Sequence, residues 1–226
     1  MFPRKKPGGR ELPRVRVLSD EEIASLWTAL ETLPYKGTRG QCISPQLALT
    51  LQFILCTGQR RGEVATAQWS NIERLPGTAE HPRARRIWRF PGNKNSREHR
   101  ILLPPPAVRC LARLRRIVGR SQYLLPARGT AAKATDRERS ITRATRKLNE
   151  ELKFREKFTP HDLRRTVRTN FARLGVPQEV AERALNHAQE NLMVATYNQH
   201  RYTDEIGEAF EKWSALLGSI IGKVTP

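Results

Sequence analysis

The chain has 226 residues, which is enough for one large domain or two small ones. A hydrophobic content of 38% and a mean hydropathy of −0.61 are typical of a globular chain, and no apolar run is long enough to span a bilayer. The net charge of +19 and the sequence pI of about 10.9 exceed what solubility requires. We therefore expect a polyanionic partner, nucleic acid first, with a membrane surface or an acidic protein as alternatives.

Residues 1–17 are rich in Pro, Gly, Arg and Lys and are expected to form a basic linker or arm. They lack the apolar segment of a secretory signal. The three cysteines are scattered, with no CxxC pair, which predicts neither a disulfide framework nor a zinc site and favours a reducing, intracellular setting.

The first predicted helix begins with a capping-box pattern, Ser19 followed by Glu22. The second, at 44–57, is apolar on all sides, so we expect it to be the central core helix, ended by Gly58. Segments 85–90 and 99–103 alternate polar with apolar residues around a polar turn, which predicts a β-hairpin.

A third strand is expected near 70–74, a helix with a basic face at 105–119 and a mobile basic loop at 127–140. Further helices are expected at about 140–152, 160–174, 177–186, 189–199 and 204–222. The predicted fold class is α+β, mainly α-helical, with a small antiparallel β-sheet of about three strands.

The stretch TPHDLRRT has the marks of a helix start, with Thr159 as the N-cap and a proline at the first helical position. On a helical wheel His161, Arg164 and Arg168 lie together at the edge of the apolar stripe, where a site could form. Arg165 points nearly opposite to that stripe, towards solvent or a DNA backbone. A basic helix end that lies on phosphate without chemistry is the alternative.

The stretch TGQRRGEV places Arg60 after a glycine break, with Glu63 one helical turn later, so the acid could hold the arginine rigidly. An ordinary surface ion pair is the alternative. Lys94 lies in the polar hairpin turn, where a lysine is usually only solvated.

In RALNHA, Asn186 could adopt the left-handed conformation that ends a helix and so present His187. A structural histidine is the alternative. Tyr197 and Tyr202 follow in VATYNQHRY, and either could simply be a half-buried tyrosine.

Together and in this order, these motifs resemble those of the tyrosine recombinases, also called phage integrases, over about residues 18–215. The wording TGQRRGEV, NKNSREHRILL and TPHDLRRT is especially similar to integrases of prophages and genomic islands. The chain has Leu-Asn-His where the family usually has Leu-Gly-His. The family normally carries a helical DNA-binding domain before the catalytic one, whereas here about 17 basic residues precede the first helix. We expect a catalytic domain at 18–203 and a C-terminal helix and tail at 204–226.

The resemblance implies a catalytic set of Arg60, Lys94, His161, Arg164, His187 and Tyr197, supported by Glu63, with DNA contacts at Arg61, Arg97, Arg165 and Arg168. It implies that Tyr197 attacks the scissile phosphate and forms a 3′-phosphotyrosyl link while the two catalytic arginines bind its oxygens. No cofactor or metal ion is implied.

The implied function is site-specific recombination for the integration or excision of a mobile element. The implied partner is a double-stranded DNA attachment site, bound by a homotetramer that is monomeric in solution, with accessory DNA-bending proteins. No membrane is implied, and the expected location is the cytoplasm, at the bacterial nucleoid. The alternatives are a type IB topoisomerase-like enzyme and a non-catalytic DNA-binding remnant of an integrase.

Overall fold

The structure, a computed structural model, describes residues 15–36, 43–77, 84–90, 99–126, 133–186 and 202–222. Its helices are α1 (Asp20–Lys36), α2 (Pro45–Thr57), α3 (Arg61–Thr66), α4 (Pro105–Val118), α5 (Ala134–Leu152), α6 (Pro160–Arg173), α7 (Gln178–Ala184) and α9 (Thr203–Gly222). One three-residue 3₁₀ turn, Trp69–Asn71, precedes an antiparallel sheet of β1 (Ile72–Leu75), β2 (Arg85–Phe90) and β3 (His99–Leu102) in that order. The predicted α+β class is confirmed.

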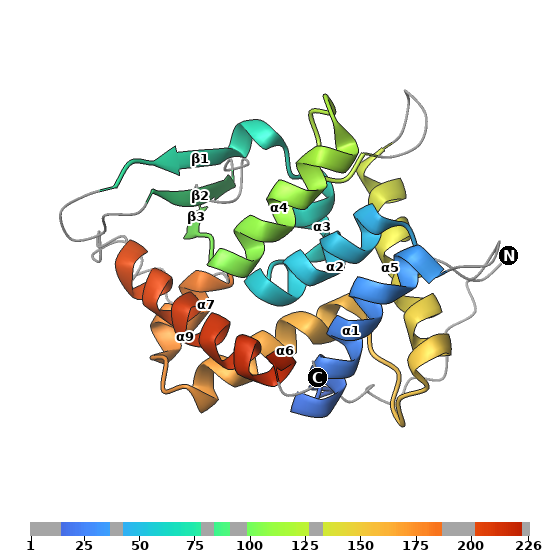
Figure 1. The fold of residues 1–226 in the computed structure, drawn as a ribbon. Helices are drawn as coiled ribbons and strands as arrows, with labels where there is room; N and C mark the ends of the chain where they lie inside the picture. The colour runs from blue at the N-terminus through green and yellow to red at the C-terminus, as the bar shows by residue number, and fades with distance from the viewer. Residues whose placement is uncertain are drawn as a thin grey trace, which may run out of the picture.

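Helix α2 is the centre of the core, as its all-round apolarity predicts. It lies between α4 on one side and α1 and α6 on the other, and the sheet lies at one end of the molecule near the start of α9 (Figure 1). Ser44 caps its first turn, and every residue from 48 to 57 is buried. Two of the cysteines, Cys56 of α2 and Cys110 of α4, are buried free thiols.

Gly58 ends α2 in the left-handed conformation, with a φ of 63°. A Cβ atom at this position would lie 2.6 Å from the Leu185 side chain and 3.1 Å from that of Val167. Glycine is therefore needed here both for the backbone conformation and for the close approach of α6 and the end of α7.

The hairpin strands were predicted within a residue or two of where they lie, and the third strand, expected near 70–74, is found at 72–75. In the register of the sheet, Ile87 pairs with Leu102 and Trp88 with Ile101. Trp88 packs on Phe53 of α2 with ring centroids 5.2 Å apart, which fixes the sheet to the core helix. The hairpin turn lies outside the described residues.

The prediction of a loop at 127–140 was wrong for its second half, because α5 begins at residue 134. Asp136 accepts a hydrogen bond from the backbone N–H of Lys133 (3.0 Å) and so caps the helix. The guanidinium of Arg137 lies 3.7 Å from the ring centroid of Tyr123. Such a tertiary contact stabilises helix in a segment whose own sequence is too polar to reveal it. The helix expected at 189–199 lies outside the described residues.

Helix α9 folds back onto its own domain. Its buried stripe consists of Ile206, Phe210, Trp213, Leu217 and Ile220, as the sequence predicts. The Trp213 indole N–H donates to the backbone oxygen of Leu55 in α2 (3.0 Å), so the helix is joined to the centre of the core. Within the described ranges, no helix has the length and apolarity to cross a membrane.

The Trp213 contact predicts a large stability effect. Trp213→Ala should lower the free energy of unfolding by about 3–5 kcal/mol, because it removes a fully buried aromatic side chain and leaves a cavity. Urea denaturation of this variant beside Lys212→Ala, an exposed neighbour on the same helix, measures the effect. Equal midpoints for the two variants would mean that α9 does not pack on the domain in solution.

Candidate functional site

Arg60 lies in the turn between α2 and α3, where its guanidinium is held from two directions. Its Nη1 donates to the Glu63 carboxylate (3.1 Å) and to the backbone oxygen of Asn186 (2.7 Å). Glu63 is fixed in turn, because it accepts hydrogen bonds from the Arg60 backbone N–H (2.8 Å) and the Asn186 side-chain amide (3.0 Å). The Arg60 side chain is still 41% exposed, so it can reach a ligand from a constrained position.

Arg164, on the second turn of α6, is only 2% exposed. Its Nη1 donates to the backbone oxygen of Gly58 (3.0 Å), and its Nη2 donates to that of Leu185. These carbonyls offset part of the large cost of burying a guanidinium. Burial, followed by the nearby charge of Arg60, lowers the pKa of Arg164 to about 10, so the group remains charged at neutral pH.

The two arginines are held by the same two turns of the chain. The turn after α2 carries Arg60 and supplies the Gly58 carbonyl, while the turn after α7 supplies the carbonyls of Leu185 and Asn186. Gly58 and Asn186 have positive φ values of 63° and 53°, which confirms the left-handed conformation predicted for the asparagine. Glycine and asparagine tolerate this conformation better than other residues, so these two residue types shape the site.

His161 lies exposed on the first turn of α6, one turn before Arg164. Partial burial, followed by the charges of Arg165 and Arg164, lowers its pKa, and the nearby carboxylate of Asp162 opposes the change. The shift favours the neutral imidazole, which is the form that can accept a proton.

Asp162 is fully buried and organises the start of α6. Its Oδ2 accepts hydrogen bonds from the backbone N–H and the hydroxyl of Thr159 (both 2.8 Å), and its Oδ1 accepts one from Arg165 (2.7 Å). The prediction that Arg165 faces solvent or DNA was incomplete. Its guanidinium pairs with the buried Asp162 carboxylate, and the Arg165 side chain is 30% exposed. Arg168 is likewise paired, with Glu182 at 2.8 Å.

A basic groove of about 470 Å³ lies beside α3 and α5. It is lined by Arg61, Thr135, Glu138, Arg139, Thr142, Arg143 and Arg146. Arg61 is held by Glu138 (3.3 Å) yet 48% exposed. The arginines at 139, 143 and 146 share one face of α5 because their spacing follows the helical period. Of the residues that line this groove, the sequence prediction named only Arg61, and it assigned the part of α5 that carries Thr135, Glu138 and Arg139 to a loop.

The structure brings Arg60, Glu63 and Arg164 together at the two turns, with His161 close enough to respond to both arginines. Four predicted site residues lie outside the described residues: Lys94, Arg97, His187 and Tyr197. Tyr202, the other candidate tyrosine, is partly buried, and the guanidinium of Arg183 lies 4.2 Å from its ring centroid.

His99, the first residue of β3, was missed by the sequence prediction because a polar residue is ordinary in an alternating strand. Its ring packs on Phe90 (centroids 5.1 Å apart), and its Nε2 is buried without a hydrogen-bond partner among the residues described. Burial lowers its pKa to about 4, helped by Arg164 and Arg60 and opposed by a hydrogen bond with the backbone of Ala184. The structure thus places a neutral histidine beside the arginine pair.

Solved recombinases share this fold. The XerH site-specific recombinase bound to its difH substrate is similar with a TM-score of 0.56 and 16% identity, over 76% of this chain and 47% of XerH. XerA recombinase gives 0.54 and 20%, over 98% and 68%. The lambda integrase tetramer bound to a Holliday junction gives 0.52 and 20%, over 87% and 51%. The fold is that of the tyrosine recombinase catalytic domain.

The chain belongs to the phage integrase family, whose family model matches residues 16–204. It spans about half the length of the XerH and lambda integrase chains that it matches. No curated protein matches the sequence.

The neutral state of His99, whose Nε2 is buried, predicts a pH dependence of stability. The folded pKa of about 4 lies below the unfolded value of 6.5, so the unfolded chain binds more protons between these values. Stability should therefore be lost as pH falls from about 6.5 towards 4, by about 2–3 kcal/mol at pH 4.5. Urea denaturation at pH 7 and pH 4.5 should show this loss in the native chain and a smaller one in His99→Phe. Equal losses would contradict the assignment.

Proposed function

We propose that the chain is the catalytic domain of a site-specific DNA recombinase that breaks and rejoins DNA through a 3′-phosphotyrosyl intermediate. The reaction would integrate or excise a mobile element. Membership of the phage integrase family supports this proposal. The observation that carries it is the pair of arginines, Arg60 and Arg164, held side by side by backbone carbonyls.

This pair suits the transition state of phosphodiester cleavage, in which negative charge gathers on the non-bridging oxygens of phosphorus. A guanidinium has five N–H donors, and each of these two uses only part of that number on the residues that the structure describes. The remaining donors are preorganised, so they can bind the developing charge without reorganising during the reaction. Arginine also suits phosphate because its planar fork makes paired hydrogen bonds.

The reaction can be written from the residues. The Tyr197 hydroxyl oxygen would attack phosphorus and pass its proton to His161, while the bond from phosphorus to the 5′-oxygen breaks. Lys94 would protonate that leaving oxygen, and His187 would donate to a non-bridging oxygen. A 5′-hydroxyl from another strand reverses these steps and completes strand exchange. No cofactor is required, because the arginines supply the positive charge that metal ions supply in other phosphoryl-transfer enzymes.

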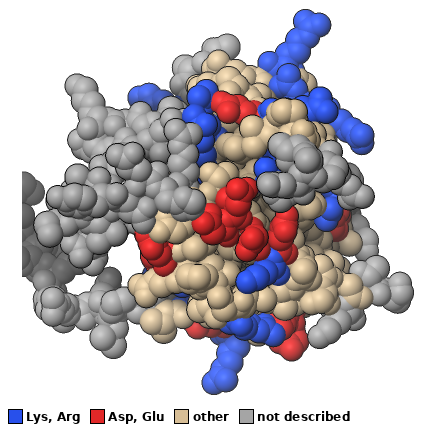
Figure 2. Space-filling model, turned by 90° about the vertical axis from the view of Figure 1, so that its left-hand side faces the viewer, with Lys and Arg blue, Asp and Glu red and all other residues tan. Residues whose placement is uncertain are grey.

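The distribution of acidic and basic side chains indicates which side of the molecule would bind DNA. Figure 2 shows acidic side chains gathered in the middle of the face that lies at the left of Figure 1. The start of α9, on that side, carries Asp204 and Glu205. Helices α3 and α5, whose side chains line the basic groove, lie away from this face (Figure 1). Because like charge repels phosphate, we place DNA over the groove and the start of α6.

Assembly forms the finer part of the proposal. One matched structure is a lambda integrase tetramer on a Holliday junction, which supports a homotetramer on attachment-site DNA, from protomers that are monomeric in solution. Accessory DNA-bending proteins and a nucleoid location belong to the same proposal. The matched structures are recombinases and integrases, so neither a topoisomerase nor a non-catalytic remnant is favoured.

The nucleophile is tested by trapping the covalent intermediate. The native chain and Tyr202→Phe should form a protein–DNA adduct on a nicked attachment site, because the nick lets the cleaved strand diffuse away before religation. Tyr197→Phe should form none. Denaturing gel electrophoresis with mass spectrometry of the modified peptide measures the outcome. An adduct in Tyr197→Phe would overturn the assignment.

Neighbouring arginines provide a matched test of the site. Arg60→Ala should slow cleavage at saturating DNA by roughly 10²-fold or more, as loss of a preorganised donor does. Arg61→Ala should leave that rate nearly unchanged but weaken binding, reducing the slope of log K against log salt by about 0.9 if it contacts one phosphate. Single-turnover cleavage and binding titrations at several salt concentrations separate the two. A larger loss of cleavage rate in Arg61→Ala would contradict the site.

A further inference from the structure

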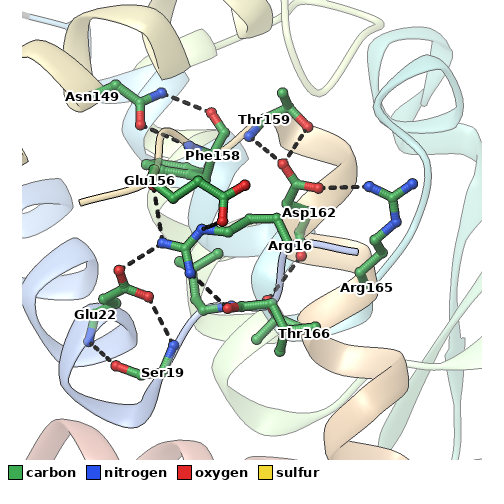
Figure 3. A network of polar contacts seen from close by, with 12 residues as sticks. Arg16, Ser19, Glu22, Asn149, Glu156, Phe158, Thr159, Asp162, Arg165 and Thr166 are labelled. Carbon is green, nitrogen blue, oxygen red and sulfur yellow. Dashed lines mark hydrogen bonds and ion pairs between the residues drawn. The ribbon is translucent and has the colours of Figure 1, made fainter. Parts of the chain in front are cut away.

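Arg16 anchors the segment that leads into α1, residues 15–19 (Figure 3). The Nη2 of Arg16 donates to the Glu22 carboxylate (2.6 Å) and to the backbone oxygen of Glu156 (3.1 Å), while Nη1 donates to the backbone oxygen of Val17 (2.7 Å). Its Nε lies 3.8 Å from the Glu156 carboxylate. Arg16 thus joins the segment both to α1 and to the connection between α5 and α6.

The backbone of the same segment also contacts α6 directly. The N–H of Leu18 donates to the hydroxyl of Thr166 (3.0 Å), and that hydroxyl donates to the backbone oxygen of Asp162 (2.8 Å). Leu18 and Thr166 are both buried. A buried N–H that loses its partner destabilises the folded state, so displacement of residues 15–19 would also break the contact with Thr166 of α6.

The start of α6 is therefore supported from three sides, all visible in Figure 3. The Asn149 side chain of α5 binds the backbone N–H and oxygen of Phe158 (2.9 and 2.7 Å). Asp162 caps the helix through Thr159. The third support is residues 15–19, which are distant from α6 in the sequence: Leu18 and Thr166 are 148 positions apart.

Arg16 is poorly suited to contact DNA itself. Its side chain is 9% exposed, compared with 48% for Arg61 in the basic groove. The hydrogen bond to Glu22 and the nearby carboxylates of Glu156 and Asp162 raise its pKa, so its charge is permanent and already matched by acids. Its contacts position the chain.

We propose that Arg16 is a positioning residue that couples the order of residues 15–19 to the placement of the first turns of α6, and hence to His161 and Arg164. The inference rests on the proposed function, since these are its proposed catalytic groups. Displacement of residues 15–19 would therefore change the geometry of His161 and of the buried Arg164.

The test compares Arg16→Ala with Arg173→Ala. Arg173 also joins α6 to α1, through Asp20 at 2.8 Å, but at the far end of α6 and with a 54% exposed side chain. Arg16→Ala should slow single-turnover cleavage of a nicked site at saturating DNA by about tenfold or more, because small misplacements of catalytic groups are costly. The DNA affinity and the salt slope of Arg16→Ala should stay within about twofold of the native values. For Arg173→Ala, the cleavage rate, the DNA affinity and the salt slope should all stay within about twofold.

Equal cleavage rates for the two variants would overturn the proposal. So would a weaker affinity with a smaller salt slope in Arg16→Ala, because that would make Arg16 a phosphate contact. Hydrogen exchange on the DNA-free protein gives a readout that does not depend on activity. Exchange over 157–166 should quicken in Arg16→Ala, with α2 unchanged, whereas unchanged exchange over 157–166 would refute the coupling.

A milder variant covers the case in which Arg16→Ala unfolds the whole domain. Glu22→Gln keeps a hydrogen-bond acceptor for Arg16 but removes one charge, and should quicken exchange over 157–166 to a smaller extent. If the variant leaves exchange there unchanged, the coupling is wrong. Failure of the native chain to form a Tyr197 adduct would refute the proposed function alone, because the exchange experiment needs no cleavage.

Discussion

The constraint on which the site depends is the placement of two guanidinium groups side by side, one of them buried. Like charges repel, and burial removes the water that would weaken that repulsion. The fold offsets this cost with the carbonyls of Gly58, Leu185 and Asn186 and with the carboxylate of Glu63. The consequence is a site rich in fixed positive charge, which under the proposed function complements the charge of a phosphate.

Much of the surrounding structure serves that placement. The two turns that supply the carbonyls contain Gly58 and Asn186 in the left-handed conformation, and Gly58 must also admit the side chains of Leu185 and Val167. Asp162 fixes the start of α6, where a single turn of helix separates the exposed His161 from the buried Arg164. The packing of Gly58 at the end of α2 therefore also helps to position Arg164.

Local parts of this arrangement were predictable from sequence, and tertiary parts were not. The sequence indicated that Glu63 could hold Arg60 and that Asn186 could be left-handed, and the structure shows both, because both effects act within a few residues. The inward turn of Arg165 depends on a buried carboxylate, and the early start of α5 depends partly on stacking of Arg137 on Tyr123. His99 pairs with Phe90 in the sheet and feels the charges of Arg60 and Arg164, both distant from it in sequence. Such contacts join residues far apart in sequence, which no local pattern reports.

The central claim is that the paired arginines bind the scissile phosphate. The most direct measurement is an experimental structure of Tyr197→Phe bound to attachment-site DNA, in which cleavage is blocked but the phosphate is retained. The account predicts that the non-bridging oxygens lie within hydrogen-bond distance of both Arg60 and Arg164, with the duplex over α3 and α5. A scissile phosphate bound elsewhere, with the two guanidiniums contacting only their protein carbonyls and Glu63, would contradict it.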